Sequence, residues 1–304
     1  MQLGLLTAIL PDDPIEKIID DAAKIGYRCL EVACWPKGQA ARRYAGVTHI
    51  DVDQLSDARI QELQTCCRQR GVQISALCYY PNPLSPDAEI QKESVAHIKK
   101  LIVAAKRLGV SRVNTFIGKD KTKTILENFV LFDAVWPEII RFAEENQIYI
   151  GIENCPMYFT EDEWPGGNNL ACTPEIWETM FAKLDSPYFG LNYDPSHLYL
   201  QQMDYVKPLY TFRDRIFHVH FKDIRIYRDK LDRCGIFAPP LSYFAPKIPG
   251  LGEIDWRAFL SALYDIGYDG PACVEIEDKA FEGSRDQVMK AIAYSYRYLS
   301  AFID

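Results

Sequence analysis

Short apolar runs and segments with helical hydrophobic spacing alternate eight times along this sequence. Continuous apolar runs are typical of parallel strands, which are buried on both faces, and parallel strands need a long crossover between them, usually a helix. Eight such units close naturally as a (β/α)₈ barrel, the α/β fold that we expect. The predicted strands span residues 2–8, 28–33, 72–78, 110–117, 148–153, 188–193, 216–222 and 271–275.

We expect one domain over residues 1–304, because no linker or shift in composition interrupts the alternation. The rival is an open, doubly wound sheet, but no G-x-G-x-x-G follows the first strand, which disfavours a dinucleotide-binding version of it. The active site of a barrel lies at the carboxyl ends of its strands. The long loops after the second, fifth and seventh strands should therefore surround the site, with an aromatic wall supplied by Trp35, Trp164, Tyr243 and Phe244.

Composition narrows the classes of partner. Hydrophobic residues make up 48% of the chain and charged residues 25%, as in globular proteins. The net charge of −8 argues against nucleic acid or an anionic membrane, which both reward clustered Lys and Arg. With no signal peptide or membrane-length apolar run, and nine cysteines at no metal-like spacing, we expect a cytoplasmic protein. A homo-oligomer held by the aromatic-rich loops is compatible with the sequence.

Four of the predicted strands end in an ionisable residue. If these strands are neighbours, three carboxylates and one imidazole meet at the same edge of the sheet. Carboxylates that close repel one another unless a cation lies among them. The sequence therefore predicts a divalent metal site with catalytic carboxylates, formed by Glu153, Asp194, His220 and Glu275.

Each of these residues has a plainer alternative. Glu153 could be a solvated or helix-capping carboxylate, and Asp194, which precedes a proline, could start a turn. Glu275 competes with Glu277 for the end of its strand. Because side chains alternate along a strand, we expect only His220 of the pair His218 and His220 to face the barrel centre, with the other ring packed against a helix.

Three carboxylate oxygens and one imidazole nitrogen form an oxygen-rich ligand set. Such a set suits Mn²⁺ or Mg²⁺, and Co²⁺ is acceptable, whereas Zn²⁺ usually takes more nitrogen or sulfur. We therefore expect one divalent ion, with Mn²⁺ first and Mg²⁺, Co²⁺ or Zn²⁺ as alternatives.

Several segments of the second half of the chain resemble one known family. They are residues 152–154, 193–197, 218–223, 249–256 and 270–278. On these motifs the chain resembles the xylose isomerase-like barrel superfamily, specifically the sugar isomerase/epimerase group, which also includes ketose 3-epimerases and endonuclease IV-type DNA repair enzymes. The resemblance implies that Glu153, Asp194, His220 and Glu275 hold one divalent ion.

The resemblance also implies roles in catalysis. Glu153 and Glu275 would double as acid and base groups, and His197 would contact a small-molecule sugar substrate. Lys222, Trp35 and Tyr79 are further candidates for substrate contact. The expected reaction is isomerisation or epimerisation of a sugar, in which one glutamate removes a proton, the metal stabilises an enediolate, and the other glutamate returns a proton.

Three other functions are kept open. The same ion and bases could serve a lyase or deglycosidase that acts on 3-oxo sugars. An endonuclease IV-like phosphodiesterase is disfavoured, since that branch uses a trinuclear zinc cluster with many histidines and this chain has five. A non-catalytic sugar-binding barrel is disfavoured because all four ligand positions are filled.

Anion-binding residues are harder to place. Arg225 and Arg228 are candidates for a substrate-binding arginine, but a solvated loop charge explains each of them equally well. The segment 283–285 before the last helix fits a plain helix cap better than an anion site. Neither the identity of the sugar nor its phosphorylation follows from the sequence.

Overall fold

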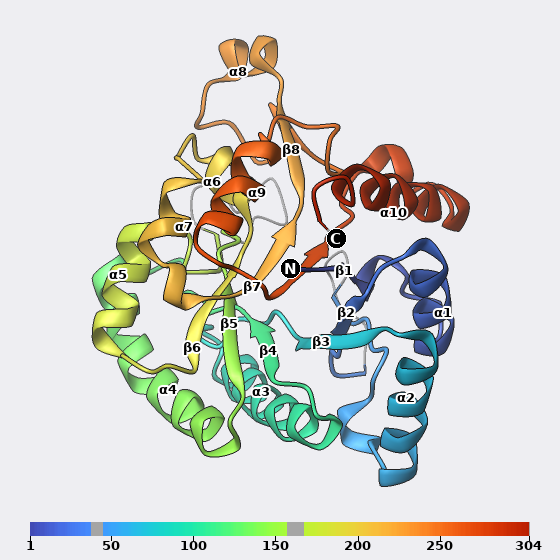
Figure 1. Ribbon diagram of the computed structural model, residues 1–304. Coiled ribbons are helices and arrows are strands. Elements are labelled where there is room, and N and C mark those ends of the chain that lie inside the picture. The colour runs from blue at the N-terminus through green and yellow to red at the C-terminus, as the bar shows by residue number, and fades with distance from the viewer. Residues whose placement is uncertain (38–44, 157–166, 304) are drawn as a thin grey trace.

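Eight parallel strands close into a barrel, which confirms the predicted fold (Figure 1). The computed structural model describes residues 1–37, 45–156 and 167–303. Around the barrel the strand order is β1-β10-β7-β6-β5-β4-β3-β2, and β1 pairs with β2 to close it. The barrel strands are β1 Gln2–Leu6, β2 Cys29–Ala33, β3 Gln73–Cys78, β4 Arg112–Thr115, β5 Tyr149–Glu153, β6 Phe189–Tyr193, β7 Ile216–Phe221 and β10 Pro271–Val274.

Helices surround the barrel (Figure 1). Trp136 of α4 stacks on Phe189 of β6 at a centroid distance of 6.0 Å, and both side chains are fully buried. The main apolar core therefore lies between strands and helices. The helices are α1 Ile15–Ile25, α2 Asp57–Arg70, α3 Ala88–Leu108, α4 Ile125–Asn146, α5 Pro174–Lys183, α6 Pro195–Leu200, α7 Lys207–Thr211, α8 Arg228–Cys234, α9 Trp256–Asp265 and α10 Arg285–Leu299, with 3₁₀ turns at Thr7–Ile9, Val52–Gln54, Arg213–Arg215 and Lys279–Phe281.

Capping residues fix where several helices begin. The hydroxyl of Thr124 accepts from the backbone N–H of Glu127, whose carboxylate accepts in return from the backbone of Thr124, so α4 starts with a capping box. Ser284 caps α10 by accepting from the N–H of Gln287. The segment 283–285 therefore forms a helix cap, which the sequence favoured over an anion site.

The loop after β7 contains structure that the sequence pattern did not reveal. Residues 223–253 were expected to form one long loop, yet they carry an antiparallel ribbon of β8 (Asp223–Ile226) and β9 (Phe244–Lys247). Between these strands, α8 projects away from the barrel (Figure 1). The first strand is also shorter than predicted, because it ends at Leu6 and a 3₁₀ turn follows.

The interior of the barrel is more polar than its outer face. Seven polar residues of the strands that point into it are fully or almost fully buried, namely Glu31, Ser75, Asn114, Glu153, Asn192, His218 and His220. Buried polar groups need partners, and these partners organise the site described below. None of the helices in residues 1–37, 45–156 and 167–303 combines the length and apolar character needed to span a membrane.

Candidate metal centre

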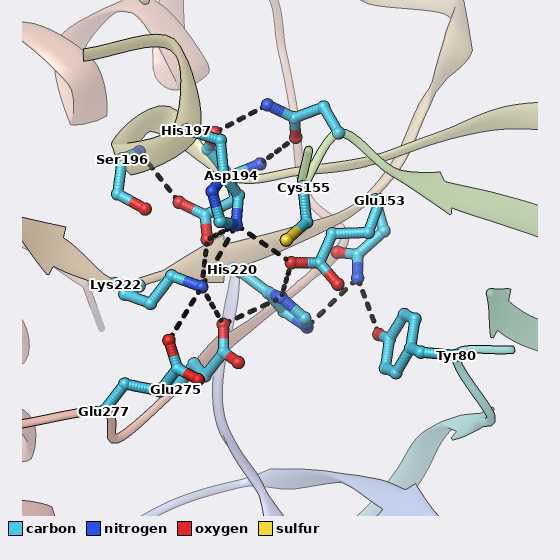
Figure 2. Close-up of polar contacts among 12 residues, drawn as sticks. Tyr80, Glu153, Cys155, Asp194, Ser196, His197, His220, Lys222, Glu275 and Glu277 are labelled. Carbon is cyan, nitrogen blue, oxygen red and sulfur yellow. Dashed lines mark hydrogen bonds and ion pairs between the residues drawn. The ribbon is translucent and has the colours of Figure 1, made fainter. Parts of the chain in front are cut away.

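The four residues predicted to hold a metal come together at the carboxyl ends of four strands (Figure 2). Glu153 is the last residue of β5, His220 lies near the end of β7, and Asp194 and Glu275 directly follow β6 and β10. One ligand atom from each residue lies within 4.8 Å of the others. The barrel therefore gathers three carboxylates and one imidazole about a common point.

Local hydrogen bonds fix Asp194 in place. Its Oδ1 accepts from the backbone N–H of Ser196 at 2.8 Å, so Asp194 caps α6. The side chain of Asn154 accepts from the N–H of Asp194 and donates to its carbonyl, at 2.8 and 2.9 Å. These two hydrogen bonds hold the end of β5 beside the end of β6. Asp194 Oδ2 remains directed into the site (Figure 2).

Two buried atoms that lack hydrogen bonds support a metal at this point. Asp194 Oδ2 and His220 Nδ1 make no hydrogen bond within the described part of the chain, although Lys222 Nζ lies 3.2 Å from the first and carboxylates lie 3.5 Å from the second. Buried polar atoms in native proteins are nearly always hydrogen-bonded, so both atoms are available to a ligand placed between them. A carboxylate-rich set with one imidazole suits a divalent ion. The residues therefore fit the metal that the sequence predicted.

Lys222 places a positive charge inside the same cluster (Figure 2). Its Nζ lies 2.9 Å from Glu275 Oε2, 3.2 Å from Asp194 Oδ2 and 3.4 Å from Glu277 Oε2. Burial opposes the charge, but Glu275, Glu277 and Asp194 together hold the pKa of Lys222 well above its usual value. The site therefore contains a fixed ammonium group that can contact a bound oxyanion or hydroxyl.

Both candidate acid/base glutamates are held as carboxylates. Burial raises the pKa of Glu153, but His220, His197 and Lys222 lower it well below the ordinary value. Glu275 is also buried, and Lys222 and His220 lower its pKa below 4.5. His197 Nε2 lies 3.3 Å from Glu153 Oε1 and 3.1 Å from Lys222 Nζ, so His197 belongs to the same site.

The expectation that His218 faces a helix is wrong. Residues two apart on a strand project to the same face, and both rings point into the barrel, with centroids 5.7 Å apart. His218 Nδ1 donates to Asn192 Oδ1 at 2.9 Å, and its Nε2 lies 3.3 Å from Ser75 Oγ. His218 is therefore fully bonded one layer below the candidate metal centre, and the choice of His220 rests on its position nearer the strand end.

A cavity of about 470 Å³ opens above the carboxylates. Trp35 and Phe244 line it, as the predicted aromatic wall requires, whereas Trp164 lies outside the described residues. Tyr79 does not line the cavity. Its ring packs edge-on against the ring of Trp35, with a centroid distance of 4.8 Å, so Tyr79 contacts a residue of the lining without being part of it. Tyr243, Arg225 and Arg228 are also absent from the lining, which instead carries four lysines, Lys222, Lys230, Lys247 and Lys279.

Sequence reasoning missed several residues of the site. Tyr80 and Cys155 line the cavity, and the side chain of Asn192 contacts both histidines of β7. Glu31 is fully buried in the middle of β2. Burial raises the pKa of Glu31, but His220 and His218 lower it to about 2, so it is a carboxylate. A single charged residue inside the apolar run 29–33 was the available signal for Glu31.

Comparison with known proteins finds a matching family model and several related sequences. A family model described as xylose isomerase-like TIM barrel matches residues 19–298. A Bacillus subtilis protein, uncharacterized protein YfiH, is 26% identical in an alignment 303 positions long, and the match covers 91% of this chain and 93% of the relative. An inosose dehydratase from Clostridium perfringens is 33% identical over 212 residues, 58% of this chain and 70% of that enzyme. Matches to other inosose dehydratases cover less than half of those proteins.

Solved structures share the fold along the whole chain. A D-psicose 3-epimerase from Clostridium cellulolyticum H10, solved with D-tagatose, superposes with a TM-score of 0.73 over 100% of both chains. Sequence identity in this pair is 18%, so the match concerns the fold alone.

Proposed function

Because the chain belongs to the xylose isomerase-like TIM barrel family, we propose that it is a divalent-metal-dependent sugar isomerase or epimerase. The observation that carries the proposal is the pairing of two ionised glutamates across one metal position. Glu153 Oε1 and Glu275 Oε2 each lie 3.5 Å from His220 Nδ1, and they come from strands that are not neighbours in the barrel. Two bases placed in this way can act on one carbon from different sides.

We assign the metal to Glu153, Asp194, His220 and Glu275. Mn²⁺ is the first choice because three of the four ligands are carboxylates, with Mg²⁺, Co²⁺ and Zn²⁺ as alternatives. When bound, such an ion supplies Lewis-acid polarisation of a carbonyl, which makes the neighbouring C–H acidic.

The residues of the chain supply the remaining steps. One glutamate removes the proton next to the carbonyl, which leaves an enediolate, and the other returns a proton to the opposite face in an epimerisation. In an isomerisation the proton returns to the adjacent carbon. Lys222 and His197 donate hydrogen bonds to substrate oxygens, since both lie beside the glutamates at the base of the cavity. Trp35 covers the apolar face of the sugar.

The test is proton exchange with solvent. The Mn²⁺-loaded protein would be incubated in deuterated water with a panel of free ketoses and aldoses, and NMR would follow both deuterium uptake and the products. We expect deuterium at the carbon next to the carbonyl together with an isomer of unchanged composition. Absence of exchange and of products across the panel, with metal bound, would reject the proposal.

A dehydratase is the second candidate, and the inosose dehydratase relative favours it. Removal of a proton next to a carbonyl is the first step of this reaction too. It would then continue by loss of a hydroxyl group from the next carbon, with Lys222 or His197 placed to protonate the departing oxygen. Incubation with inososes and, separately, with 3-oxo sugars distinguishes the two reactions, since a dehydratase product is lighter by one water in mass spectrometry.

A further inference from the structure

Glu31 is a buried carboxylate that no step of the proposed reaction uses. It lies in β2, its side chain is fully buried, and it is not one of the four ligands assigned to the metal. A buried charge is costly unless it is paired and hydrogen-bonded. The partners of Glu31 therefore indicate what this carboxylate does.

Both oxygens of Glu31 are engaged. The hydroxyl of Tyr80 donates to Oε1. Oε2 lies 2.7 Å from His220 Nε2, the shortest contact of that ring. A distance of 2.7 Å is that of a charge-assisted hydrogen bond, in which the ring N–H donates to the carboxylate. Asn192 Nδ2 lies farther from His220 Nε2, at 3.0 Å, and has Tyr80 Oη at 3.1 Å to accept its proton.

The two nitrogens of the His220 ring thus face different surroundings. Nε2 faces Glu31, while Nδ1 faces Glu153 and Glu275 at 3.5 Å. A neutral imidazole has one proton, and it must lie on one of the two nitrogens. A carboxylate at Nε2 keeps the proton there, and this leaves the Nδ1 lone pair for a metal.

Glu31 could instead be a ligand of an ion held with His218 and His220, because the three residues lie close enough. The contacts argue against this arrangement. His218 Nδ1 already donates to Asn192 at 2.9 Å. The 2.7 Å between Glu31 Oε2 and His220 Nε2 is also short for two ligands of one ion, because atoms about 2.0–2.2 Å from an ion lie about 3 Å or more apart at octahedral or tetrahedral angles. It is the usual distance of a charge-assisted hydrogen bond.

We propose that Glu31 is a positioning residue, which fixes the proton of His220 on Nε2 and so presents Nδ1 to the metal. Tyr80 holds the carboxylate of Glu31 in the required orientation. This inference rests on the metal site of the proposed function.

The first test is metal affinity. Wild type, Glu31→Gln and Ser75→Ala would be stripped of metal and titrated with Mn²⁺ by calorimetry. In Glu31→Gln, Tyr80 keeps its acceptor by taking the amide oxygen, so the NH₂ group faces His220 Nε2 and moves the ring proton to Nδ1. We expect the Kd for Mn²⁺ to rise about 10–100-fold. Ser75→Ala is the matched control, because Ser75 is buried in the same barrel and bonds His218 rather than His220. Its Kd should stay within about threefold of wild type.

The second test does not depend on a variant that folds. NMR of ¹⁵N-histidine-labelled wild type loaded with Zn²⁺ reports which ring nitrogen carries the proton, and five histidines keep assignment tractable. We expect the proton of His220 on Nε2. Equal Mn²⁺ affinity in wild type and Glu31→Gln would overturn the role of Glu31 alone. A proton on Nδ1 would overturn that role and would also remove this nitrogen from the ligand set, because a protonated nitrogen cannot bind a metal. Wild type that binds no divalent ion would overturn the metal-dependent function and this inference together.

Discussion

The two carboxylate oxygens of Asp194 have different roles. Oδ1 caps α6 through the N–H of Ser196, while Oδ2 is buried without a hydrogen bond beside His220. The structural task and the proposed ligand role can therefore be separated by substitution, because an amide oxygen can still cap a helix although an amide nitrogen cannot bind a cation.

We predict that Asp194→Ala and Asp194→Asn both lose Mn²⁺ binding, measured by calorimetry. Only Asp194→Ala should also lose stability, by about 1 kcal/mol in urea unfolding of the metal-free proteins, since an alanine cap leaves the first turn of α6 unsatisfied. Retention of wild-type Mn²⁺ affinity in either variant would remove Asp194 from the ligand set.

Glu275→Gln should keep the fold and lose turnover. The amide fills the same volume but cannot accept a proton, and loss of one general base lowers kcat by about 10²–10⁴-fold. The measurement is exchange of substrate hydrogen with deuterated solvent at saturating metal. Glu277→Gln is the control, because Glu277 also contacts Lys222, at 3.4 Å, but is not among the ligands. Exchange at the normal rate in Glu275→Gln would show that the acid/base assignment is wrong.

Residues at or near strand ends could be predicted, whereas Glu31 in the middle of a strand could not. An ionisable group that ends an apolar run must emerge at the sheet edge, so Glu153, Asp194 and Glu275 were placed correctly by pattern alone. Glu31 sits within an apolar run, and its partners come from elements far along the chain, 49 residues away for Tyr80 and 189 for His220. No local pattern encodes such a contact.

At the scale of elements, Asp223 anchors the ribbon that follows β7. Its carboxylate accepts four hydrogen bonds, from Trp256 Nε1 and from the backbone of residues 224, 250 and 254, at 2.8–3.0 Å. It is fully buried at the start of β8. This one side chain therefore joins the ribbon, the loop after it and α9, and the ribbon in turn supplies Phe244 and Lys247 to the cavity.

We predict that Asp223→Ala lowers the free energy of unfolding by about 3 kcal/mol or more. Several buried donors lose their acceptor, and each unsatisfied group costs about 1–3 kcal/mol. Urea unfolding monitored by tryptophan fluorescence gives the value, and Asp229→Ala on the exposed face of α8 is the control, with an expected change within about 0.5 kcal/mol. A change in Asp223→Ala as small as that of the control would contradict the anchoring role.

The ribbon escaped prediction for a physical reason as well. Parallel barrel strands are buried on both faces, so apolar runs in the sequence predict them. The strands β8 and β9 are four residues each and include Arg225, Pro246 and Lys247, so they form no such run. Their pairing depends on Asp223 and on packing against the barrel. The barrel itself was predictable because its alternating period recurs along the whole chain.

At the scale of the whole molecule, the closed barrel concentrates negative charge at one end of its interior. Glu31, Glu153, Asp194 and Glu275 are acidic residues that the fold gathers together, and the ammonium group of Lys222, 3.2 Å from Asp194 and 2.9 Å from Glu275, provides opposing charge. Each buried charge is tolerated only when it is compensated. A bound divalent ion would add compensation that the folded state alone can use, because the unfolded chain separates its ligands.

Metal removal should therefore affect both activity and stability. Dialysis against a chelator should abolish turnover and lower the Tm, and Mn²⁺ added back at about 100 times its Kd should stabilise the fold by about 2.7 kcal/mol and restore both. Asp194→Asn is the internal control, since its Tm should not respond to Mn²⁺. Differential scanning calorimetry with parallel activity assays makes the measurement. Full turnover in protein shown to be metal-free would remove Lewis-acid assistance from the reaction, and an unchanged Tm on Mn²⁺ addition would mean that the gathered carboxylates do not bind the ion.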